Sequence, residues 1–328
     1  MINNLQKLNP KLFDLAVEQS PVRKGYGEGL LEAGKLDKRI VALCADLTES
    51  TQTHLFAKEF PTRFVEMGVA EQNLAAVASG MAAMGKIPFI TSYAMFSPGR
   101  NWEQIRTTIA YNNQPVKIVG SHAGVSVGPD GGTHQAIEDI AIMRVVPNMD
   151  VVVPCDAIEA KKATLAIAQT TRPAYLRLAR EKTPVITTEA TPFVLGKANM
   201  LWRGDSAQVA IMACGPMVFN ALAAAKKLAE QKISVTVTNV HTIKPLDEET
   251  ILRVATEAGK VVTVEEHQIA GGLGSAVAEL LSEKKPMTVV RLGVHDQFGQ
   301  SGTQPELIDH YGMSVDDIVE AVKKVCRK

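Results

Sequence analysis

The sequence of 328 residues contains few cysteines, only Cys44, Cys155, Cys214 and Cys326. These four lie far apart and form no CxxC pair, so the sequence signals neither a zinc site nor a disulfide framework. At least three of them stand in apolar surroundings. We interpret these as core thiols of a protein that resides in a reducing compartment.

The sequence also lacks an excess of either charge and lacks a long apolar run. Its 35 basic and 35 acidic side chains give a formal net charge of zero, so no global field attracts nucleic acid or an anionic membrane. No window approaches the ~18 consecutive apolar residues of a membrane span. The N-terminal stretch 1–15 lacks the continuous apolar core of a signal peptide. We therefore expect a cytoplasmic protein that binds neither nucleic acid nor a membrane.

Short β-rich runs alternate with longer helical stretches along the first part of the chain. Strands are predicted at 40–44, 87–93, 116–121 and 149–154, and helices at 14–34, 71–84, 100–111, 134–144 and 156–169. The strand runs are predominantly apolar and read as continuous runs, as is typical of strands that are buried on both faces of a parallel sheet. The alternation therefore predicts an α/β domain.

A stretch rich in Thr and Pro, 181–206, separates this region from a second series of the same kind. In that series, strands are predicted at 208–214, 233–240, 261–266 and 287–292, and helices at 216–231, 247–257, 272–283 and 314–325. We therefore predict an α/β fold of two domains, a parallel-sheet domain over 1–188 and a smaller domain over 189–328.

The densest polar cluster is SHAGVSVGPDGGTHQ at 121–135, which follows a predicted strand and precedes a predicted helix. Ligands bind at the carboxyl ends of the strands in open α/β sheets. Five glycines between 120 and 132 permit tight turns and close backbone approach. His122, Asp130 and His134 make this loop a candidate site. The plainer alternative is a flexible loop whose polar residues cap the next helix.

Other polar and aromatic features are weaker when each is taken alone. Tyr93 and Phe96 could form a platform for a flat heterocycle, although core packing at a helix start explains them better by itself. Scattered residues that would gain from meeting an anion are Arg23, Ser50, Arg177 and Arg180. The glycine run GGLGSA at 271–276 lacks the last glycine of GxGxxG, and no GxxxxGK[ST] occurs. A Rossmann or P-loop nucleotide site is therefore disfavoured.

The sequence nevertheless resembles the C-terminal half of transketolase. The motifs GVAEQ at 68–72, SYAMF at 92–96, GPDGGTHQ at 128–135 and EEHQIAGGLGSA at 265–276 occur in the family's order and at similar separations. The resemblance covers nearly the whole chain. It implies a pyrimidine-binding domain of a thiamine-diphosphate enzyme, followed by a transketolase C-terminal domain.

The half of the family pattern that binds diphosphate is missing from this sequence. That half carries Gly-Asp-Gly and a downstream pair of asparagines, and only Gly204-Asp205-Ser206 comes near it here. The chain thus resembles the second subunit of a split, two-chain transketolase. The resemblance implies an N-terminal partner subunit that supplies the Mg²⁺ site, an α2β2 heterotetramer, thiamine diphosphate as cofactor, and no metal ligand on this chain.

The resemblance also implies a role for ten residues. Glu71 and His134 are the catalytic residues; the cofactor is contacted by Glu71, Phe96, Tyr93 and Asp46; the substrate is bound by Arg23, Ser50, His122, Asp130, His134 and Arg180. Glu71 would hydrogen-bond the aminopyrimidine ring, and the apolar helix behind it would keep the pocket dry. The reaction implied is transfer of a two-carbon ketol unit from a ketose phosphate to an aldose phosphate, as in the pentose phosphate pathway.

Several alternatives remain open. Within the superfamily these are a split enzyme for apulose phosphate or a sulfo-sugar, the beta subunit of a 2-oxoacid dehydrogenase, and deoxyxylulose phosphate synthase, which is a single chain. A subunit that only stabilises or regulates another chain is a different class. The intact Glu71, Phe96 and His134 argue against that class, because a non-catalytic relative has no need to keep them.

Overall fold

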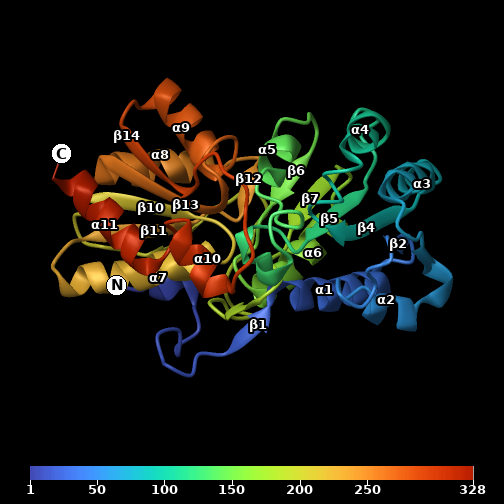
Figure 1. Cartoon of the computed structure of the whole chain (residues 1–328), viewed down its shortest axis with the longest axis horizontal. Coiled ribbons are helices and arrows are strands. Elements are labelled where there is room, and N and C mark those ends of the chain that lie inside the picture. The colour runs from blue at the N-terminus through green and yellow to red at the C-terminus, as the bar shows by residue number, and fades with distance from the viewer. Residues whose placement is uncertain (328) are drawn as a thin grey trace.

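The computed structural model describes residues 1–327, which form two lobes lying side by side (Figure 1). A sheet of seven strands organises one lobe and a sheet of five strands organises the other. Both chain ends lie in the five-stranded lobe (Figure 1). The predicted α/β fold of two domains, with a largely parallel sheet in the first, is confirmed.

The seven-stranded sheet has the order β12-β6-β7-β5-β4-β2-β3. Its strands are β12 (Thr242–Lys244), β6 (Asp150–Val152), β7 (Ala174–Arg177), β5 (Lys117–Ser121), β4 (Ile87–Tyr93), β2 (Ile40–Cys44) and β3 (Phe64–Glu66). All neighbours are parallel except β12, which runs antiparallel to β6. Every residue of β2 and β5 is buried. This explains why β2 is a continuous apolar run, whereas β5 combines apolar residues with the buried polar side chains of Lys117 and Ser121.

Helices cover both faces of this sheet (Figure 1). One face carries α1 (Val22–Leu36), α2 (His54–Glu59) and α6 (Ala157–Ala168); the other carries α3 (Glu71–Ala83), α4 (Trp102–Gln104) with the π-helical turn Ile105–Ala110, and α5 (Asp139–Arg144). Helix α3 buries Leu74, Ala75 and Ala78 against the sheet, whereas Gln72, Asn73, Ala76, Val77 and Gly80 stay exposed. The core of this chain therefore accounts for the apolar residues on the buried face of α3, but not for the small and apolar residues on its exposed face.

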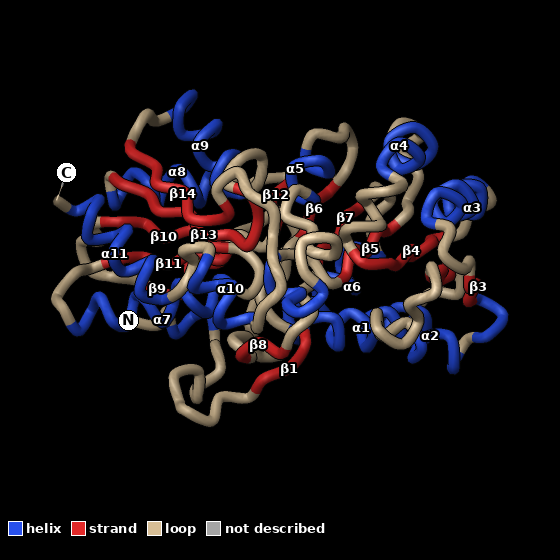
Figure 2. The backbone as a smooth tube through the Cα atoms, in the orientation of Figure 1, coloured by secondary structure: helices blue, strands red, loops and turns tan. Residues whose placement is uncertain are grey.

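The five-stranded sheet has the order β14-β13-β10-β11-β9, and only β9 is antiparallel (Figure 2). Its strands are β14 (Thr288–Val294), β13 (Lys260–Gln268), β10 (Val209–Ala213), β11 (Val235–Asn239) and β9 (Asn199–Trp202). The helices of this lobe are α7 (Met217–Glu230), α8 (Glu248–Ala258), α9 (Leu273–Lys284), α10 (Gln304–His310) and α11 (Val315–Cys326). An antiparallel ribbon of β1 (Gln19–Pro21) and β8 (Lys182–Pro184) lies beside the sheets (Figure 2).

Two predicted helices start later than the periodicity indicates. The helix predicted over 14–34 begins at Val22, directly after Pro21, because a proline inside the helix would remove a backbone donor and clash with the preceding turn. The helix predicted over 134–144 begins at Asp139. The residues before Asp139 are held instead by contacts with the other lobe. Short strands that lie outside the predicted set include β1, β7, β8, β9 and β12.

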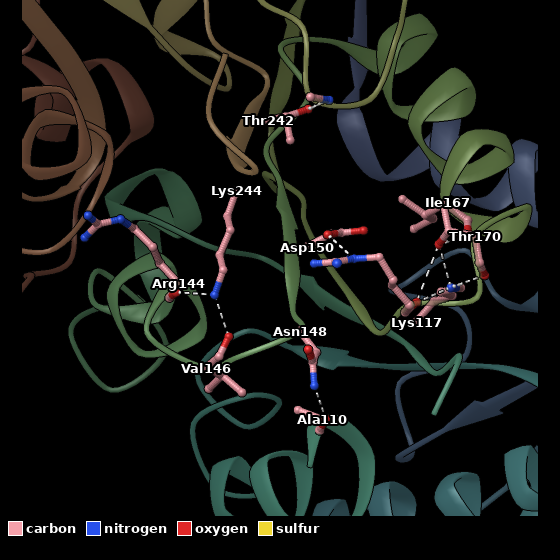
Figure 3. A network of polar contacts seen from close by, with 12 residues as sticks. Ala110, Lys117, Arg144, Val146, Asn148, Asp150, Ile167, Thr170, Thr242 and Lys244 are labelled. Atoms are coloured by element: carbon pink, nitrogen blue, oxygen red, sulfur yellow. Dashed lines mark hydrogen bonds and ion pairs between the residues drawn. The ribbon is translucent and has the colours of Figure 1, made fainter. Parts of the chain in front are cut away.

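The two lobes exchange short segments, so the division at 188/189 stays a prediction. At the chain start, the backbone N–H of Asn3 donates to Leu201 O at 2.8 Å, which joins the N-terminus to β9. Conversely, β12, which lies in the sequence between two strands of the five-stranded sheet, forms an edge strand of the seven-stranded sheet. The Lys244 Nζ fastens that edge by donating to Arg144 O at 2.9 Å and to Val146 O at 2.6 Å (Figure 3).

The amino end of the seven-stranded sheet is closed by buried polar contacts. Lys117, the first residue of β5, is fully buried, and its Nζ donates to Thr170 O at 2.9 Å and to Arg172 O at 2.6 Å (Figure 3). Burial lowers the pKa of Lys117 to about 7, against the attraction of Asp150. We therefore assign these contacts at the amino end of the sheet a structural role. Within residues 1–327 no helix combines the length and apolar character that crossing a membrane needs.

Candidate functional site

The predicted site residues gather at the opposite edge, where the parallel strands of the seven-stranded sheet end. Tyr93 is the last residue of β4, His122 directly follows β5, and Arg180 stands shortly after β7. Arg23 lies in the first turn of α1. This edge is where ligands bind in open parallel sheets.

Glu71 is the first residue of α3 and has only 2% of its surface exposed. Its Oε2 accepts a hydrogen bond of 2.8 Å from Nη1 of Arg100. The Arg100 side chain is half exposed, and its guanidinium carbon lies 5.1 Å from the centre of the Phe96 ring. A buried carboxylate is thus balanced by one cation that also lies beside an aromatic ring.

Four rings form a cluster next to this ion pair. Tyr93 stacks on His122, with centroids 3.8 Å apart and planes 25° apart. Phe96 lies 6.2 Å from Tyr93 and meets His134 edge-on at 5.5 Å. Tyr93 and Phe96, three residues apart in the sequence, therefore lie in one cluster with the two histidines of the 121–135 segment.

A cationic group adjoins the rings. Arg23 Nη1 lies 3.5 Å from Nε2 of His122 and donates to the backbone oxygen of Arg180 at 2.6 Å. The Arg180 guanidinium faces Asp130 at 3.8 Å, close to the limit for an ion pair. Two guanidinium groups and an imidazole from three separate elements therefore meet beside Tyr93.

The electrostatics of this group favour an anion. Burial, followed by the positive charges of Arg23 and Arg180, lowers the pKa of His122 to about 3. Burial and the charge of Arg180 also lower the pKa of Arg23. His122 is therefore neutral at physiological pH and can act as a hydrogen-bonding group between two cations. An entering anion would relieve the repulsion between these cations.

Two of the ten predicted residues lie on a separate loop at the same edge. Asp46 follows β2, is exposed, and has a φ of 58°; its backbone N–H donates to Glu66 Oε1 at 2.7 Å. Ser50 is half-buried in the same loop. A Cβ added to Gly27 would lie 2.7 Å from the Gln52 side chain, so this loop packs against α1 one turn after Arg23.

His122 also has a left-handed backbone, with a φ of 55°. Non-glycine residues rarely adopt this conformation, and its cost must be offset by the surrounding structure. Asp46 and His122 share this conformation, and each follows a strand at this edge within two residues. Backbone strain therefore coincides with the candidate site.

Three features of the site do not follow from the sequence pattern. Arg100 belongs to the aromatic motif at 92–102, but its pairing with Glu71 depends on the folded arrangement. Glu66 carries no motif of its own, although it holds the loop of Asp46. Arg177, grouped in the sequence with the anion-binding arginines, is instead buried and bonded by its Nε to Asp139 Oδ2 at 2.7 Å.

Comparisons with known proteins agree with the motifs. Residues 18–185 match the family "Transketolase, pyrimidine binding domain" and residues 196–318 match "Transketolase, C-terminal domain". The chain is 45% identical to a putative transketolase C-terminal section of Methanocaldococcus jannaschii, over 94% of this chain and 96% of that protein.

Two further relatives carry more specific names. A 6-deoxy-6-sulfo-D-fructose transketolase subunit of Clostridium sp. is 42% identical, over 96% of this chain and 98% of its own length. An apulose-4-phosphate transketolase subunit of Phocaeicola vulgatus is 38% identical, over 93% of this chain and 97% of its own length.

A solved structure described as a split gene transketolase, inactive beta4 tetramer, is 44% identical, with a TM-score of 0.87 over 94% of this chain and 98% of that chain. These similarities extend over almost the full length of proteins that are themselves single sections or subunits of a transketolase. The chain therefore belongs to the transketolase family, as a subunit of the split type.

Proposed function

We propose that this chain is the subunit of a thiamine-diphosphate-dependent transketolase that transfers a two-carbon ketol unit from a ketose phosphate to an aldose phosphate. The observation that carries the proposal is the group formed by two cations, Arg23 and Arg180, and the neutral imidazole of His122, beside the rings of Tyr93 and Phe96. The carboxylates that face Arg180 in the free chain, Asp130 at 3.8 Å and Glu181 at 3.6 Å, lie near the limit for an ion pair, and a neutral substrate would add no counter-charge. A terminal phosphate is a suitable ligand for the two arginines.

Other anionic sugars form the second candidate. Relatives of similar identity are named for a sulfo-fructose and for apulose 4-phosphate. A sulfonate is tetrahedral and anionic like a phosphate but carries less charge. The guanidinium group of an arginine can donate hydrogen bonds to a phosphate or to a sulfonate. The preference for one of these substrates therefore depends on the sugar as well as on the arginines. If five-carbon phosphates are the preferred pair, the reaction belongs to the pentose phosphate pathway.

The residues fit an aminopyrimidine ring. The half-exposed Arg100 contacts both the buried carboxylate of Glu71 and the partly exposed ring of Phe96. A flat ring can therefore stack on Phe96 with a ring nitrogen directed at the Glu71 carboxyl group. When bound, thiamine diphosphate would supply the nucleophilic carbon that cleaves and forms the carbon–carbon bond.

Each residue of this chain would then have a defined task. The Glu71 carboxyl group shares a proton with the ring nitrogen, while Phe96 and Tyr93 orient the ring and exclude water. The His134 imidazole moves a proton on and off a substrate hydroxyl, and Asp130 binds a second hydroxyl. Arg23 and Arg180 hold the anionic end of the sugar, with Ser50 and His122 as additional hydrogen-bonding groups. Asp46 approaches the cofactor from the neighbouring loop.

A partner chain completes the site in this proposal. Helix α3 starts at Glu71 and exposes Ala76, Val77 and Gly80, small residues that permit close packing of another chain. No group of three or more His, Cys, Asp or Glu in residues 1–327 is arranged for a metal ion. We assign Mg²⁺ and the cofactor diphosphate to the partner, in an α2β2 assembly located in the cytoplasm.

The test combines the purified chain with the N-terminal subunit of the split enzyme, thiamine diphosphate and Mg²⁺. We expect no transfer by either chain alone and transfer by the mixture, with ketose phosphate and aldose phosphate as substrates. Parallel assays with a sulfo-fructose donor and with apulose 4-phosphate rank the anionic sugars. Transfer by this chain alone would contradict the split arrangement. Turnover of sulfo-fructose but not of phosphates would favour the second candidate.

A further inference from the structure

The loop over residues 124–135 carries Asp130 and His134 but has little regular structure of its own. It contains the 3-10 helical segment Val125–Asp130, which is kinked at Gly128 with φ 82° and ψ −118°. Because the kink interrupts this six-residue segment, its own backbone hydrogen bonds hold only short pieces of the loop. Its conformation must therefore be fixed by neighbours.

The first neighbour is Glu266, on β13 of the five-stranded lobe. Only 2% of this residue is exposed, and its Oε1 accepts a hydrogen bond of 2.5 Å from the backbone N–H of Ser126. A Cβ added to Gly124 would lie 2.3 Å from the same oxygen. The carboxylate of one lobe is therefore packed directly against the beginning of the loop that belongs to the other lobe.

The second neighbour is the segment 299–302, also in the five-stranded lobe. Gln135, at the end of the loop, donates from Nε2 to Val125 O at 2.9 Å and to Gln300 O at 3.0 Å. A Cβ added to Gly299 would lie 1.7 Å from Gln135 Oε1. Gln135 thus ties the two ends of the loop together and ties both to the other lobe.

Arg177, which forms a buried ion pair with Asp139, also connects the backbone of Glu266 to the end of the loop. Arg177, at the end of β7, bonds to Asp139 and donates from Nη2 to Glu266 O at 2.8 Å and to Ala136 O at 3.3 Å. One guanidinium therefore links the backbone of β13 to the residue that follows Gln135. Since Arg177 is itself 4% exposed, this link is shielded from solvent.

We propose that Glu266 and Gln135 are positioning residues, through which the five-stranded lobe sets the placement of Asp130 and His134 toward the substrate. The proposal rests on the proposed function for the assignment of Asp130 and His134 to the substrate. Neither positioning residue touches the substrate. They act by holding the loop, so their loss should displace Asp130 and His134 from the sugar and weaken its binding.

Hydrogen exchange of the chain, measured by mass spectrometry without partner or cofactor, tests the holding role. E266A removes the acceptor of the Ser126 N–H, and we expect amides in 124–135 to exchange about tenfold faster or more, as for the loss of a buried hydrogen bond to a charged group. E266Q keeps an acceptor oxygen and should exchange like the wild type. E265A is the matched control, because Glu265 is a buried neighbour that bonds Leu273 N and Gly274 N of α9 instead.

A second variant approaches the loop from the other side. G299A places a methyl group against Gln135 and leaves Glu266 intact, so it should also accelerate exchange in 124–135. If E266A does not fold, G299A decides the matter. Exchange at the wild-type rate in G299A, or acceleration in E266A no greater than in E265A, would overturn the proposal.

The assembled enzyme supplies the functional readout. With the partner chain, thiamine diphosphate and Mg²⁺, we expect E266A to raise KM for the sugar phosphate about tenfold while E266Q stays within about threefold of wild type. E265A should leave KM unchanged. A KM in E266A equal to that of E265A would overturn the positioning role. Absence of transfer in the wild-type mixture would instead refute the proposed function, and the exchange result would remain valid.

Discussion

Arg100 and Glu71 form an ion pair in which a half-exposed cation neutralises a buried carboxylate, with Nη1 and Oε2 2.8 Å apart. The guanidinium is planar, donates to Glu71, and lies beside the ring of Phe96. The aminopyrimidine ring is proposed to use these same two neighbours. Under the proposed function, Arg100 therefore stands where the cofactor ring would bind, and its exposed side leaves it a route into solvent.

Replacing Arg100 with Met should tighten cofactor binding in the assembled enzyme, because the ring no longer competes with the guanidinium for Glu71. The expected gain is about fivefold in Kd, or about 1 kcal/mol, since the pair is partly solvated. Isothermal titration calorimetry with thiamine diphosphate and Mg²⁺ measures this change. R106M, at an exposed arginine of the adjoining segment, is the control and should not alter Kd. Weaker binding by R100M would show that Arg100 supports the cofactor.

Replacing Glu71 with Ala should reduce turnover at least about a hundredfold, since proton transfer by a positioned side chain contributes this much. Far-ultraviolet circular dichroism should remain unchanged. Within residues 1–327 the Glu71 side chain bonds to Arg100 alone, and the Asn101 side chain bonds to the Glu71 backbone oxygen, which the substitution keeps. Q72A removes the exposed neighbour on the same turn and should retain activity. Turnover by E71A close to wild type would refute the role proposed for this carboxylate.

Replacing Arg180 with Ala should raise KM for phosphorylated substrates about tenfold or more, because a charge-assisted hydrogen bond is lost. A neutral ketol donor such as erythrulose should show a much smaller change. R172A is the matched control, since Arg172 precedes the opposite end of β7 and pairs with Asp150. An equal effect of R180A on both donors would remove the assignment of Arg180 to the anion.

His122 should report anion binding through its pKa. Burial and the adjacent cations hold this pKa at about 3 in the free chain. A bound phosphate stabilises the imidazolium form, so the pKa should move upward, and phosphate should bind more tightly as the pH falls toward the raised value. Nuclear magnetic resonance titration of the imidazole with and without inorganic phosphate measures the shift. A downward shift, or none at saturating phosphate, would contradict the proposed contact.

Lys117 should make stability depend on pH in the alkaline range. Burial lowers its pKa from 10.5 to about 7 in the folded chain. Between these values the unfolded chain binds the extra proton, so the unfolding free energy contributed by Lys117 rises as the pH increases, by at most roughly 5 kcal/mol. Below pH 7 both states are protonated and this slope vanishes.

Denaturant unfolding of the wild type and K117M from pH 7 to 10 checks this sign. The difference in unfolding free energy between them should change with pH in favour of the wild type. K86M, at an exposed lysine before β4, should leave the slope unchanged. A wild-type slope equal to that of K117M would show that Lys117 titrates normally.

Strands and helices with strong local patterns could be predicted closely from the sequence. The apolar runs at 40–44 and 87–93 coincide with β2 and β4, and the helix predicted over 71–84 coincides with α3 to one residue. β12, by contrast, is three residues long and contains Lys244. It becomes a strand because β6 offers an open edge, a partner that no local pattern reveals.

The sequence alone determined the α/β class, the two series of strands and helices, and the motifs that resemble transketolase. These follow from periodicity and from residue types within short windows. Tertiary structure alone decided that Arg23 lies beside His122, 99 positions away in the sequence, and that Arg100 donates a hydrogen bond to Glu71. It also decided that Arg177 pairs with the buried carboxylate of Asp139 and is not available for a bound anion. Such pairings depend on which strand ends become neighbours in the sheet. Strand order is set by packing between distant segments, and spacing along the chain does not record it.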